Sequence, residues 1–359
     1  MHLTRLSIDA LRCLRQVEVV PCAGLNLFLG GNGAGKTSVL EALYLLGSGK
    51  SFRFGGHDAV IAHGARMLQL YAELEHGGRF ERVGFERARS GWRALRNGEK
   101  VADLAELAGL VPVVCFSPES HQLISGASEV RRRFFDWIVF HVEPEFSKAY
   151  RRYARALRQR NALLKQNPDR RSLSVWTGEL AEAGEPLAAL RARVFPEFEQ
   201  LMLEALRNLL PEVAPFAVAY RRGWREGMNL RERLEMLESR ELELGHSLAG
   251  PHRGDWSVEI AGHEIREHGS RGQQKLVALA SVLVAARLYC QRRGEPPLVA
   301  LDDMSSELDV EHQRRALLEC AGLGAQLWVT GTQRTPAMDE WAAEVRTFHV
   351  EQGQITSAC

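Results

Sequence analysis

The amino-acid sequence predicts an α/β fold with a mostly parallel sheet, interrupted by an inserted, mostly helical lobe. Apolar runs at 25–29, 298–301 and 326–330 indicate buried strands, and helical patterns follow the first two of them. From about 120 to 245 the apolar residues recur at helical spacing instead. A chain of 359 residues exceeds the size at which one core keeps growing, so two lobes, or one domain with a sizeable insertion, are expected.

The first third of the chain is predicted to be rich in strands, with one helix from about 36 to 46. Strands are expected at 3–9, 16–20, 25–29, 68–75, 79–87, 92–95 and 111–116. The pairs Gly77-Gly78 and Asn97-Gly98 indicate hairpin turns, because both residues of such a turn need a positive φ.

Segment 121–245 is predicted to form an inserted lobe of several short helices. Tyr150 and Tyr153 follow the helical spacing of the apolar residues, and we expect both in the core. Proline lacks the backbone N–H that a helix interior needs, so prolines are expected to separate the helices and to exclude one long coiled coil. These prolines are Pro186, Pro196, Pro211 and Pro215.

The last third of the chain is predicted to return to the α/β pattern. Strands are expected at 256–260, 264–266, 298–301 and 326–330, and helices at 272–290 and 310–321. The turn at Ala261-Gly262 is expected to join the first two strands as a hairpin.

Composition favours a protein of the reducing cytoplasm. The six cysteines show no C-x-x-C spacing, which argues against a zinc site or a disulfide framework, and we expect their side chains to be buried. Charges within 1–9 come too early for a secretory signal. The longest nearly apolar run, 276–286, has about half the length that a membrane span needs, so we expect no membrane partner.

Positive charge is concentrated in one part of the chain. Residues 131–171 hold 12 Lys plus Arg against 4 Asp plus Glu, a local charge of +8 in a chain whose net charge is +1. Such a stretch could bind DNA phosphates without reading the base sequence. The candidates are Arg131, Arg132, Arg151, Arg152, Arg155 and Arg158, and Arg160 belongs to the same basic stretch. The alternative is a solvated helix face whose arginines pair with acids.

A glycine-rich loop between an apolar strand and a helix indicates a phosphate-binding site. The run Gly30-Gly31-Asn32-Gly33-Ala34-Gly35-Lys36-Thr37 fits the Walker A pattern, and Ser38 extends it. Backbone N–H groups and the helix N-terminus favour anions. We expect Lys36 to contact the β- and γ-phosphates of ATP and Thr37 to bind Mg²⁺. The alternative is a glycine-rich turn with a chance lysine.

Two adjacent carboxylates follow the apolar strand 298–301, at the end where α/β sheets place their ligand sites. Asp302 is expected to hold Mg²⁺ through its water shell. Asp303 is expected to activate the attacking water as a general base. The alternative is that these carboxylates cap the next helix.

A third motif precedes the predicted helix at 272–290. Gly269-Ser270-Arg271-Gly272-Gln273-Gln274-Lys275 resembles the signature motif of ABC-type ATPases. The resemblance implies an ATPase head in which Ser270, Gly272 and Gln273 bind the nucleotide held by a second chain, so that ATP joins two chains. Segment 305–309 resembles the D-loop of such dimers. Helix capping is the alternative for both segments.

Within that class the sequence resembles the RecF family over nearly its whole length. The segments that carry the resemblance are 50–53 with Asp58 and Gly64, 116–119, 131–136, 248–253 and Gln273-Gln274-Lys275. The resemblance implies an ATPase domain formed by 1–120 and 246–359, with 121–245 inserted. It also implies ATP and Mg²⁺ as ligands and binding to single-stranded and duplex DNA at gaps. Cooperation with RecR and RecO in loading RecA, and roles in replication, repair and SOS induction, are implied as well.

Some positions depart from the family's pattern. Gly254 stands where an aspartate is common, and Asp303 is shorter than the usual glutamate. No histidine occurs at 329–332, where many ABC ATPases carry one. We therefore expect weak ATP hydrolysis, and the family resemblance implies that it depends on DNA.

Two other functions share these motifs. The ATPase subunit of a transporter would need a membrane partner and usually carries that histidine. A structural chromosome protein of the SMC type would need long coiled-coil arms, which an insertion of 121–245 with its prolines is too short to form.

Overall fold

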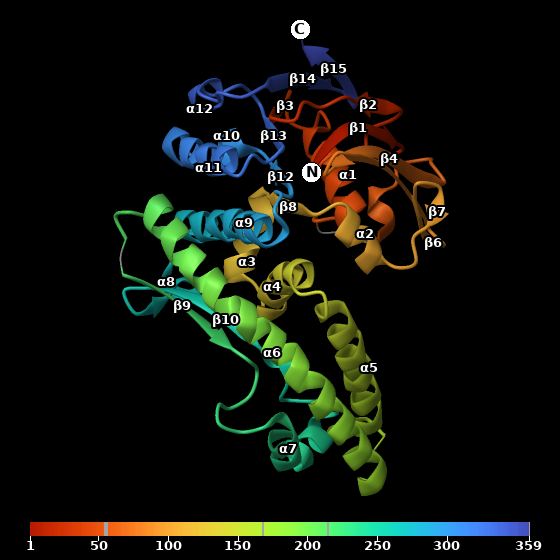
Figure 1. Ribbon diagram of the computed structural model, residues 1–359, viewed down its shortest axis with the longest axis vertical. Helices are drawn as coiled ribbons and strands as arrows, with labels where there is room; N and C mark the ends of the chain where they lie inside the picture. The colour runs from red at the N-terminus through yellow and green to blue at the C-terminus, as the bar shows by residue number, and fades with distance from the viewer. Residues whose placement is uncertain (54–56, 167–168, 214, 359) are drawn as a thin grey trace. The chain divides into compact units, whose positions relative to one another are not determined.

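The computed structural model describes residues 1–53, 57–166, 169–213 and 215–358 (Figure 1). The chain divides into two compact units, Met1–Ser120 with Leu279–Cys359, and His121–Ala278. The sequence-based division at 245 remains a prediction; in the structure, residues 246–278 pack within the second unit. No helix of the described residues is long and apolar enough to cross a membrane.

The central sheet of the first unit has the predicted, mostly parallel character. Its strand order is β15-β14-β3-β13-β12-β8, and only β14 and β15 pair antiparallel. The strands are β3 (Leu25–Leu29), β8 (Val113–Phe116), β12 (Leu298–Leu301), β13 (Leu327–Gly331), β14 (Val345–Glu351) and β15 (Gln354–Ala358). The hairpin of β14 and β15 was not predicted.

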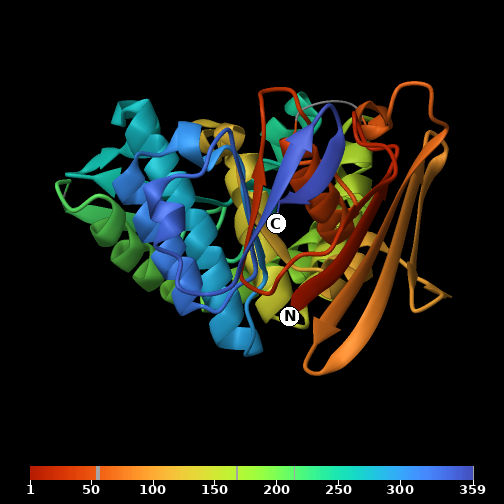
Figure 2. The ribbon, with the colours of Figure 1, turned by 90° about the horizontal axis from the view of Figure 1, so that it is seen from above.

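The second sheet of this unit is antiparallel, in the order β2-β1-β4-β5-β6-β7, and Figure 2 shows its long strands side by side. The strands are β1 (His2–Asp9), β2 (Val17–Val19), β4 (Met67–His76), β5 (Arg79–Ala88), β6 (Gly91–Arg96) and β7 (Glu99–Lys100). Asn97 and Gly98 both have positive φ, 51° and 91°, which confirms the predicted hairpin turn.

Buried aromatic and aliphatic side chains form the core of the first unit. Phe28 stacks against Trp328 and Phe348, with ring centroids 5.3 and 4.8 Å apart. The helices are α1 (Lys36–Ser48), α2 (Leu104–Leu110), α10 (Met304–Glu307), α11 (Val310–Gly322) and α12 (Pro336–Asp339), with a 3-10 turn at His57–Val60. Helix α9 (Arg271–Arg293) contributes residues to both units.

The second unit combines helices with a small antiparallel sheet in the order β11-β10-β9. The helices are α3 (Gln122–Ser125), α4 (Ser128–Val142), α5 (Phe146–Leu164), α6 (Arg170–Leu209), α7 (Leu230–Leu244) and α8 (Ile265–His268), with 3-10 turns at Pro118–His121 and Pro251–Arg253. The strands are β9 (Phe216–Arg221), β10 (Asp255–Ile260) and β11 (His263–Glu264). Arg160 and Glu241, both fully buried, form an ion pair of 2.7 Å that joins α5 to α7. Arg160 is therefore not accessible to DNA, contrary to its place in the predicted DNA-binding stretch.

The prediction of short helices separated by prolines is wrong for α6. This helix runs for 40 residues with Pro186 and Pro196 inside it. Both prolines lie on its exposed face, where the carbonyl that loses its helical hydrogen bond can bond to solvent instead. Burial of the opposite face compensates for the cost of the prolines.

Three other expectations are corrected. Residues 265–266 belong to α8 and not to a strand, because the β10–β11 hairpin ends at Glu264. Segment 216–221, within the predicted helical lobe, is strand β9 paired with β10. Tyr150 is 45% exposed, whereas Tyr153 is buried as expected.

The expectation that the cysteine side chains are buried is correct for only some of them. Cys22 and Cys320 are buried and Cys115 and Cys290 are half-buried, but Cys13 is exposed, contrary to the prediction. Cys359 lies outside the described residues.

Candidate nucleotide-binding site

The predicted phosphate loop connects β3 to α1 in the first unit. Gly33 and Gly35 have positive φ, 79° and 115°, and Gly35 is the N-cap of α1. A Cβ atom at Gly35 would lie 2.9 Å from Cys13 Sγ. Glycine is therefore needed there for both its conformation and its size. The first turn of α1 carries no acidic residue, so its N-terminus favours an anion.

Lys36 folds back over this loop. Its ammonium group donates hydrogen bonds to the carbonyls of Gly30 and Gly31, at 2.9 and 2.8 Å. The side chain is 7% exposed. Lys36 is thus held at the loop, with one more N–H available for a phosphate oxygen.

A cavity of about 530 Å³ opens beside the loop. The predicted site residues that line it are Asn32, Gly33, Gly35, Lys36, Thr37, Ser38, Asp302 and Asp303. Its volume lies within the range of small-molecule sites, and its lining combines glycine, cation, hydroxyl and carboxylate groups. The structure therefore brings the phosphate loop and the two predicted carboxylates to one cavity.

Asp302 connects three elements of this site. Its Oδ1 accepts hydrogen bonds from Thr37 Oγ1 at 2.9 Å and from Thr330 Oγ1 at 2.7 Å. The residue is 2% exposed, and burial raises the pKa of its carboxyl above the ordinary value. Such a carboxylate beside a hydroxyl fits the oxygen ligands that Mg²⁺ prefers, and a bound cation would favour the charged form of Asp302.

Asp303 differs from Asp302 in conformation and exposure. It is half-buried, has a φ of 50° and caps α10. Its backbone N–H donates to Thr330 Oγ1 at 2.8 Å, and its Oδ1 accepts from Ser306 Oγ at 2.9 Å. Thr330 therefore fixes the two aspartates relative to each other. Asp303 lines the cavity and is accessible to a water molecule there.

The cavity also includes residues that the motifs did not identify. Arg12 forms a bidentate ion pair with the fully buried Glu41, through distances of 3.0 and 2.7 Å. Arg53 lies 3.9 Å from the same carboxylate. Glu119 contributes a buried Oε2 with no hydrogen-bond partner among the described residues. Arg53 and Glu119 lie in segments 50–53 and 116–119, which carry the family resemblance. No sequence pattern indicated Arg12.

The signature residues lie in the second unit and do not line this cavity. Gln273 N donates to Ser270 Oγ at 3.2 Å, and Ser270 N donates to Gln273 Oε1 at 2.9 Å, which caps α9 reciprocally. Ser270 and Gly272 are exposed, and a Cβ at Gly272 would meet only Ser270 Oγ, 3.9 Å away. The helix start is therefore accessible to a second ligand. The expected long helix after the motif is confirmed by α9.

Capping also occurs in the predicted D-loop. Asp309 Oδ1 accepts from the backbone N–H of His312 at 2.9 Å, at the start of α11. Ser306 is bonded to Asp303 and exposed. The structure thus contains the capping contacts that were the alternative interpretation of this segment, and these contacts leave Ser306 accessible.

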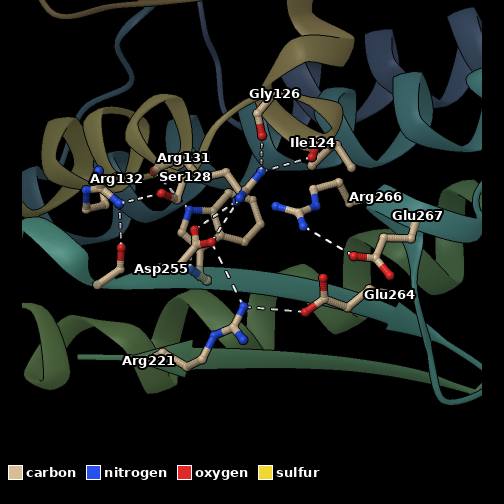
Figure 3. Close-up of polar contacts among 12 residues, drawn as sticks. Ile124, Gly126, Ser128, Arg131, Arg132, Arg221, Asp255, Glu264, Arg266 and Glu267 are labelled. Atoms are coloured by element: carbon tan, nitrogen blue, oxygen red, sulfur yellow. Dashed lines mark hydrogen bonds and ion pairs between the residues drawn. The ribbon is translucent and has the colours of Figure 1, made fainter. Parts of the chain in front are cut away.

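Two of the predicted DNA-binding arginines are held within the second unit (Figure 3). Arg131 is 4% exposed and bonds both carboxylate oxygens of Asp255, at 2.8 and 2.9 Å. Arg132 donates to Ser128 Oγ and to the carbonyl of Gly254, both at 2.8 Å. Burial lowers the pKa of Arg132. Arg131 is consequently not accessible to DNA in this arrangement.

The other four candidates are exposed on α5, at Arg151, Arg152, Arg155 and Arg158. Arg152 forms ion pairs with Glu179 at 2.8 Å and Glu182 at 3.1 Å on α6. The α5 face therefore has features of both interpretations, a DNA-binding surface and a solvated face whose arginines pair with acids. Arg152 pairs with acids, while the four arginines remain exposed.

Comparison with known proteins identifies relatives along the whole chain. A family model described as the RecF/RecN/SMC N terminal domain matches residues 2–356. The DNA replication and repair protein RecF of Xanthomonas axonopodis pv. citri is 44% identical over 361 residues, covering 99% of this chain and 98% of the relative. The protein of the same name from Shewanella denitrificans is 34% identical, with 99% of each chain covered.

Solved structures support the same fold. A structure described as the recombination mediator protein RecF with ATP in the RecFOR pathway has a TM-score of 0.89 at 24% identity, covering 100% of this chain and 98% of that one. The Smc head domain of Pyrococcus furiosus has a TM-score of 0.61 at 15% identity, covering 99% and 96%. The expected ABC-ATPase head with a helical insertion is thereby confirmed as the fold class.

Proposed function

The chain belongs to the RecF family, and on this premise we propose that it is an ATP-dependent DNA-binding protein of recombinational repair. The observation that carries the proposal is the hydrogen bond between Thr37 and Asp302, which joins the phosphate loop to the carboxylate strand at one cavity. The relatives from Xanthomonas and Shewanella are named as DNA replication and repair proteins.

ATP would bind with its phosphates against the loop 30–38 and the N-terminus of α1. Lys36 would turn an N–H toward the β- and γ-phosphates, and Thr37 with Asp302 would hold Mg²⁺, which supplies charge neutralisation on the phosphate oxygens. Asp303 would accept the proton of the attacking water. Asp303 is shorter than the glutamate usual at this position, which fits weak hydrolysis.

A second copy of the chain would complete the site. Ser270, Gly272 and Gln273, at the accessible start of α9, would bind the γ-phosphate of the nucleotide held by the partner. ATP would therefore favour a dimer, and hydrolysis would release it. Through this switch, the protein would help to load RecA together with RecR and RecO, and would support replication, repair and SOS induction in the cytoplasm.

DNA, single-stranded or duplex at gaps, would contact the exposed arginines through its phosphates. Arg151, Arg155 and Arg158 are the strongest of the original candidates, because their side chains are exposed on one helix. Contacts to phosphates carry little sequence information and weaken steeply with salt. DNA would thus be recognised by charge and shape, and would stimulate the ATPase by stabilising the dimer.

The proposal is tested by fluorescence anisotropy of a labelled gapped duplex at one salt concentration, with and without MgATP. Wild type should bind more tightly with MgATP, and Lys36→Met should not respond to it. Lys100→Met, an exposed lysine on β7, is the matched control and should behave as wild type. Equal DNA affinity with and without MgATP in wild type would refute the switch.

A further inference from the structure

A second polar cavity, of about 540 Å³, lies entirely within the second unit. Three arginines line it, from the end of β9 and from the 3-10 turn at Pro251–Arg253. The lining residues used below are Arg221, Arg222, Arg253, Ser128, Glu226 and Asp255. The cavity is separate from the phosphate loop and shares no residue with the nucleotide site.

Arg222 is fixed in place at this cavity. Its Nη2 donates to the carbonyls of Arg225 at 3.1 Å and Met228 at 2.5 Å, and its guanidinium lies 4.3 Å from the centroid of the Trp224 ring. Its Nε is buried with no hydrogen-bond partner among the described residues. Burial keeps Nε from a ligand, but Nη1, which makes no hydrogen bond among the described residues, is available to an anionic oxygen at the cavity.

A close backbone contact brings Arg253 to the same cavity. Gly223 has a φ of 105°, and a Cβ there would lie 2.1 Å from the carbonyl oxygen of Gly250. Gly250 N also donates to Gly223 O at 3.3 Å. The two turns that carry Arg222 and Arg253 therefore touch through their backbones. Arg253 is exposed, and its guanidinium makes no hydrogen bond or ion pair with any residue in the described part of the chain.

The acidic residues at this cavity compensate only part of its positive charge. Asp255 is already bonded at both oxygens by Arg131 (Figure 3). Arg131 does not line the cavity. Arg221 is 63% exposed in its side chain and lies 3.4 Å from Glu264 and 4.0 Å from Asp255. Glu226 lines the cavity and is exposed. Among the residues that the structure describes, Arg222 and Arg253 thus have no carboxylate partner.

We propose that this arginine cavity binds a phosphate group of the nucleic-acid backbone. A planar guanidinium with free N–H groups matches the geometry of phosphate oxygens, and a rigid arginine loses little entropy on binding. Ser128, the first residue of α4, adds a hydroxyl at the same cavity. The inference rests on the proposed DNA binding and adds a contact site outside the α5 face.

A free phosphate compound could bind the same arginines as a DNA phosphate does. The experiment therefore has one arm with DNA and one with inorganic pyrophosphate. The first measures anisotropy of the gapped duplex over a series of salt concentrations for wild type, Arg253→Gln and Arg240→Gln. Arg240, on α7, is exposed and does not line the cavity, which makes it the matched control. Arg253→Gln should weaken binding roughly two- to five-fold. It should also reduce the slope of log affinity against log salt by about 1, while Arg240→Gln leaves both unchanged.

The second arm titrates inorganic pyrophosphate by calorimetry into Lys36→Met and into Lys36→Met with Arg253→Gln. The Lys36 change weakens the phosphate loop in both proteins, so a difference between them reports the arginine cavity. Saturable binding lost with Arg253 would assign the cavity to phosphate even if wild type bound no DNA, and only the proposed DNA function would then fail.

Two results would overturn the inference. One is a wild type that binds DNA while Arg253→Gln keeps the same affinity and salt slope. The other is a wild type that binds no DNA, combined with identical pyrophosphate titrations of the two Lys36→Met proteins. Arg253→Lys, which keeps the charge but not the planar fork, should retain the salt slope and lose part of the affinity.

Discussion

Thr37 and Asp302, which are 265 residues apart in the sequence, are joined by a hydrogen bond of 2.9 Å from Thr37 Oγ1 to Asp302 Oδ1. Strand β13 lies between β3 and β12, and its Thr330 bonds the same carboxylate oxygen. The parallel strand order thus brings hydroxyls from α1 and β13 to one buried carboxylate at the end of β12. A pair of oxygens in this position is suited to a divalent cation.

Asp302→Asn should weaken nucleotide binding mainly when magnesium is present. Asn keeps the hydrogen-bonding shape but loses the charge that attracts the cation, and loss of one such contact typically costs roughly 10- to 100-fold in affinity. Titration of a fluorescent ATP analogue in Mg²⁺ and in EDTA measures both conditions. Glu99→Gln, at an exposed position on β7, should bind as wild type does. An equal loss of affinity in EDTA would argue against a metal role.

The same substitution should affect stability in the opposite direction. Burial raises the pKa of Asp302, so the folded state binds this proton more tightly than the unfolded state does. The charged carboxylate therefore costs stability above the ordinary pKa of about 4, and the cost is complete above the folded pKa. In nucleotide-free protein, Asp302→Asn should be more stable than wild type at pH 7, and the difference should vanish below about pH 4.

Urea unfolding at pH 7 and below pH 4 measures the stability difference between Asp302→Asn and wild type. Asp309→Asn is the contrasting control in this experiment, because the pKa of Asp309 is lowered and not raised. A backbone hydrogen bond from His312 lowers the pKa of Asp309, so its charge stabilises the folded state above the ordinary pKa, and this contribution is lost as pH falls. Asp309→Asn should therefore be slightly less stable than wild type at pH 7. If Asp302→Asn were also less stable there, the inferred cost of burying Asp302 would be wrong.

His252 should make the second unit sensitive to acid. Its ring accepts from Tyr153 at 2.5 Å and donates to the carbonyl of Ser247 at 3.0 Å, and burial lowers the pKa of His252 to about 4. The unfolded state therefore takes up this proton first, so stability should fall as pH drops from about 6.5 to 4. His252→Gln should remove this part of the pH dependence in urea unfolding. His63→Gln, at an exposed histidine, should leave it in place.

Gly35→Ala should abolish nucleotide binding. The residue has a φ of 115°, and the added Cβ would lie 2.9 Å from Cys13 Sγ, so the loop must shift. The unfavourable backbone conformation alone costs about 1–2 kcal/mol. Gly109→Ala, within α2 and with open space around it, should bind nucleotide normally and gain up to about 1 kcal/mol of stability. Unchanged nucleotide affinity in Gly35→Ala would contradict the role assigned to the loop.

The sequence predicted the elements whose signals are local. The apolar run of β3 and the Asn97-Gly98 turn each need only neighbouring residues to be recognised, and both were correct. The hairpin of β14 and β15 was missed, because its strands mix polar and apolar residues and are defined by pairing with β3. The length of α6 was missed because spacing alone did not show that both prolines face solvent.

The functional residues follow the same division. Lys36, Thr37 and Asp302 belong to motifs with fixed spacing, so they could be named in advance and lie at one cavity. Arg131 was chosen for its charge, but its partner Asp255 is 124 residues away and no local pattern indicates the pair. Composition therefore predicted a basic region, and tertiary contacts determined which of its arginines remain accessible.

The central claim, that Ser270 of one chain completes the site around Lys36 of another, is tested most directly by mixing two defective variants. Ser270→Arg and Lys36→Met should each fail to dimerise with MgATP in sedimentation velocity, whereas Ser239→Arg, at an exposed serine on α7, should dimerise as wild type does. A mixed dimer of the two defective chains contains one intact composite site. We predict that their equimolar mixture forms an ATP-dependent dimer, and a mixture that stays monomeric, or Ser270→Arg that dimerises alone, would contradict the shared site.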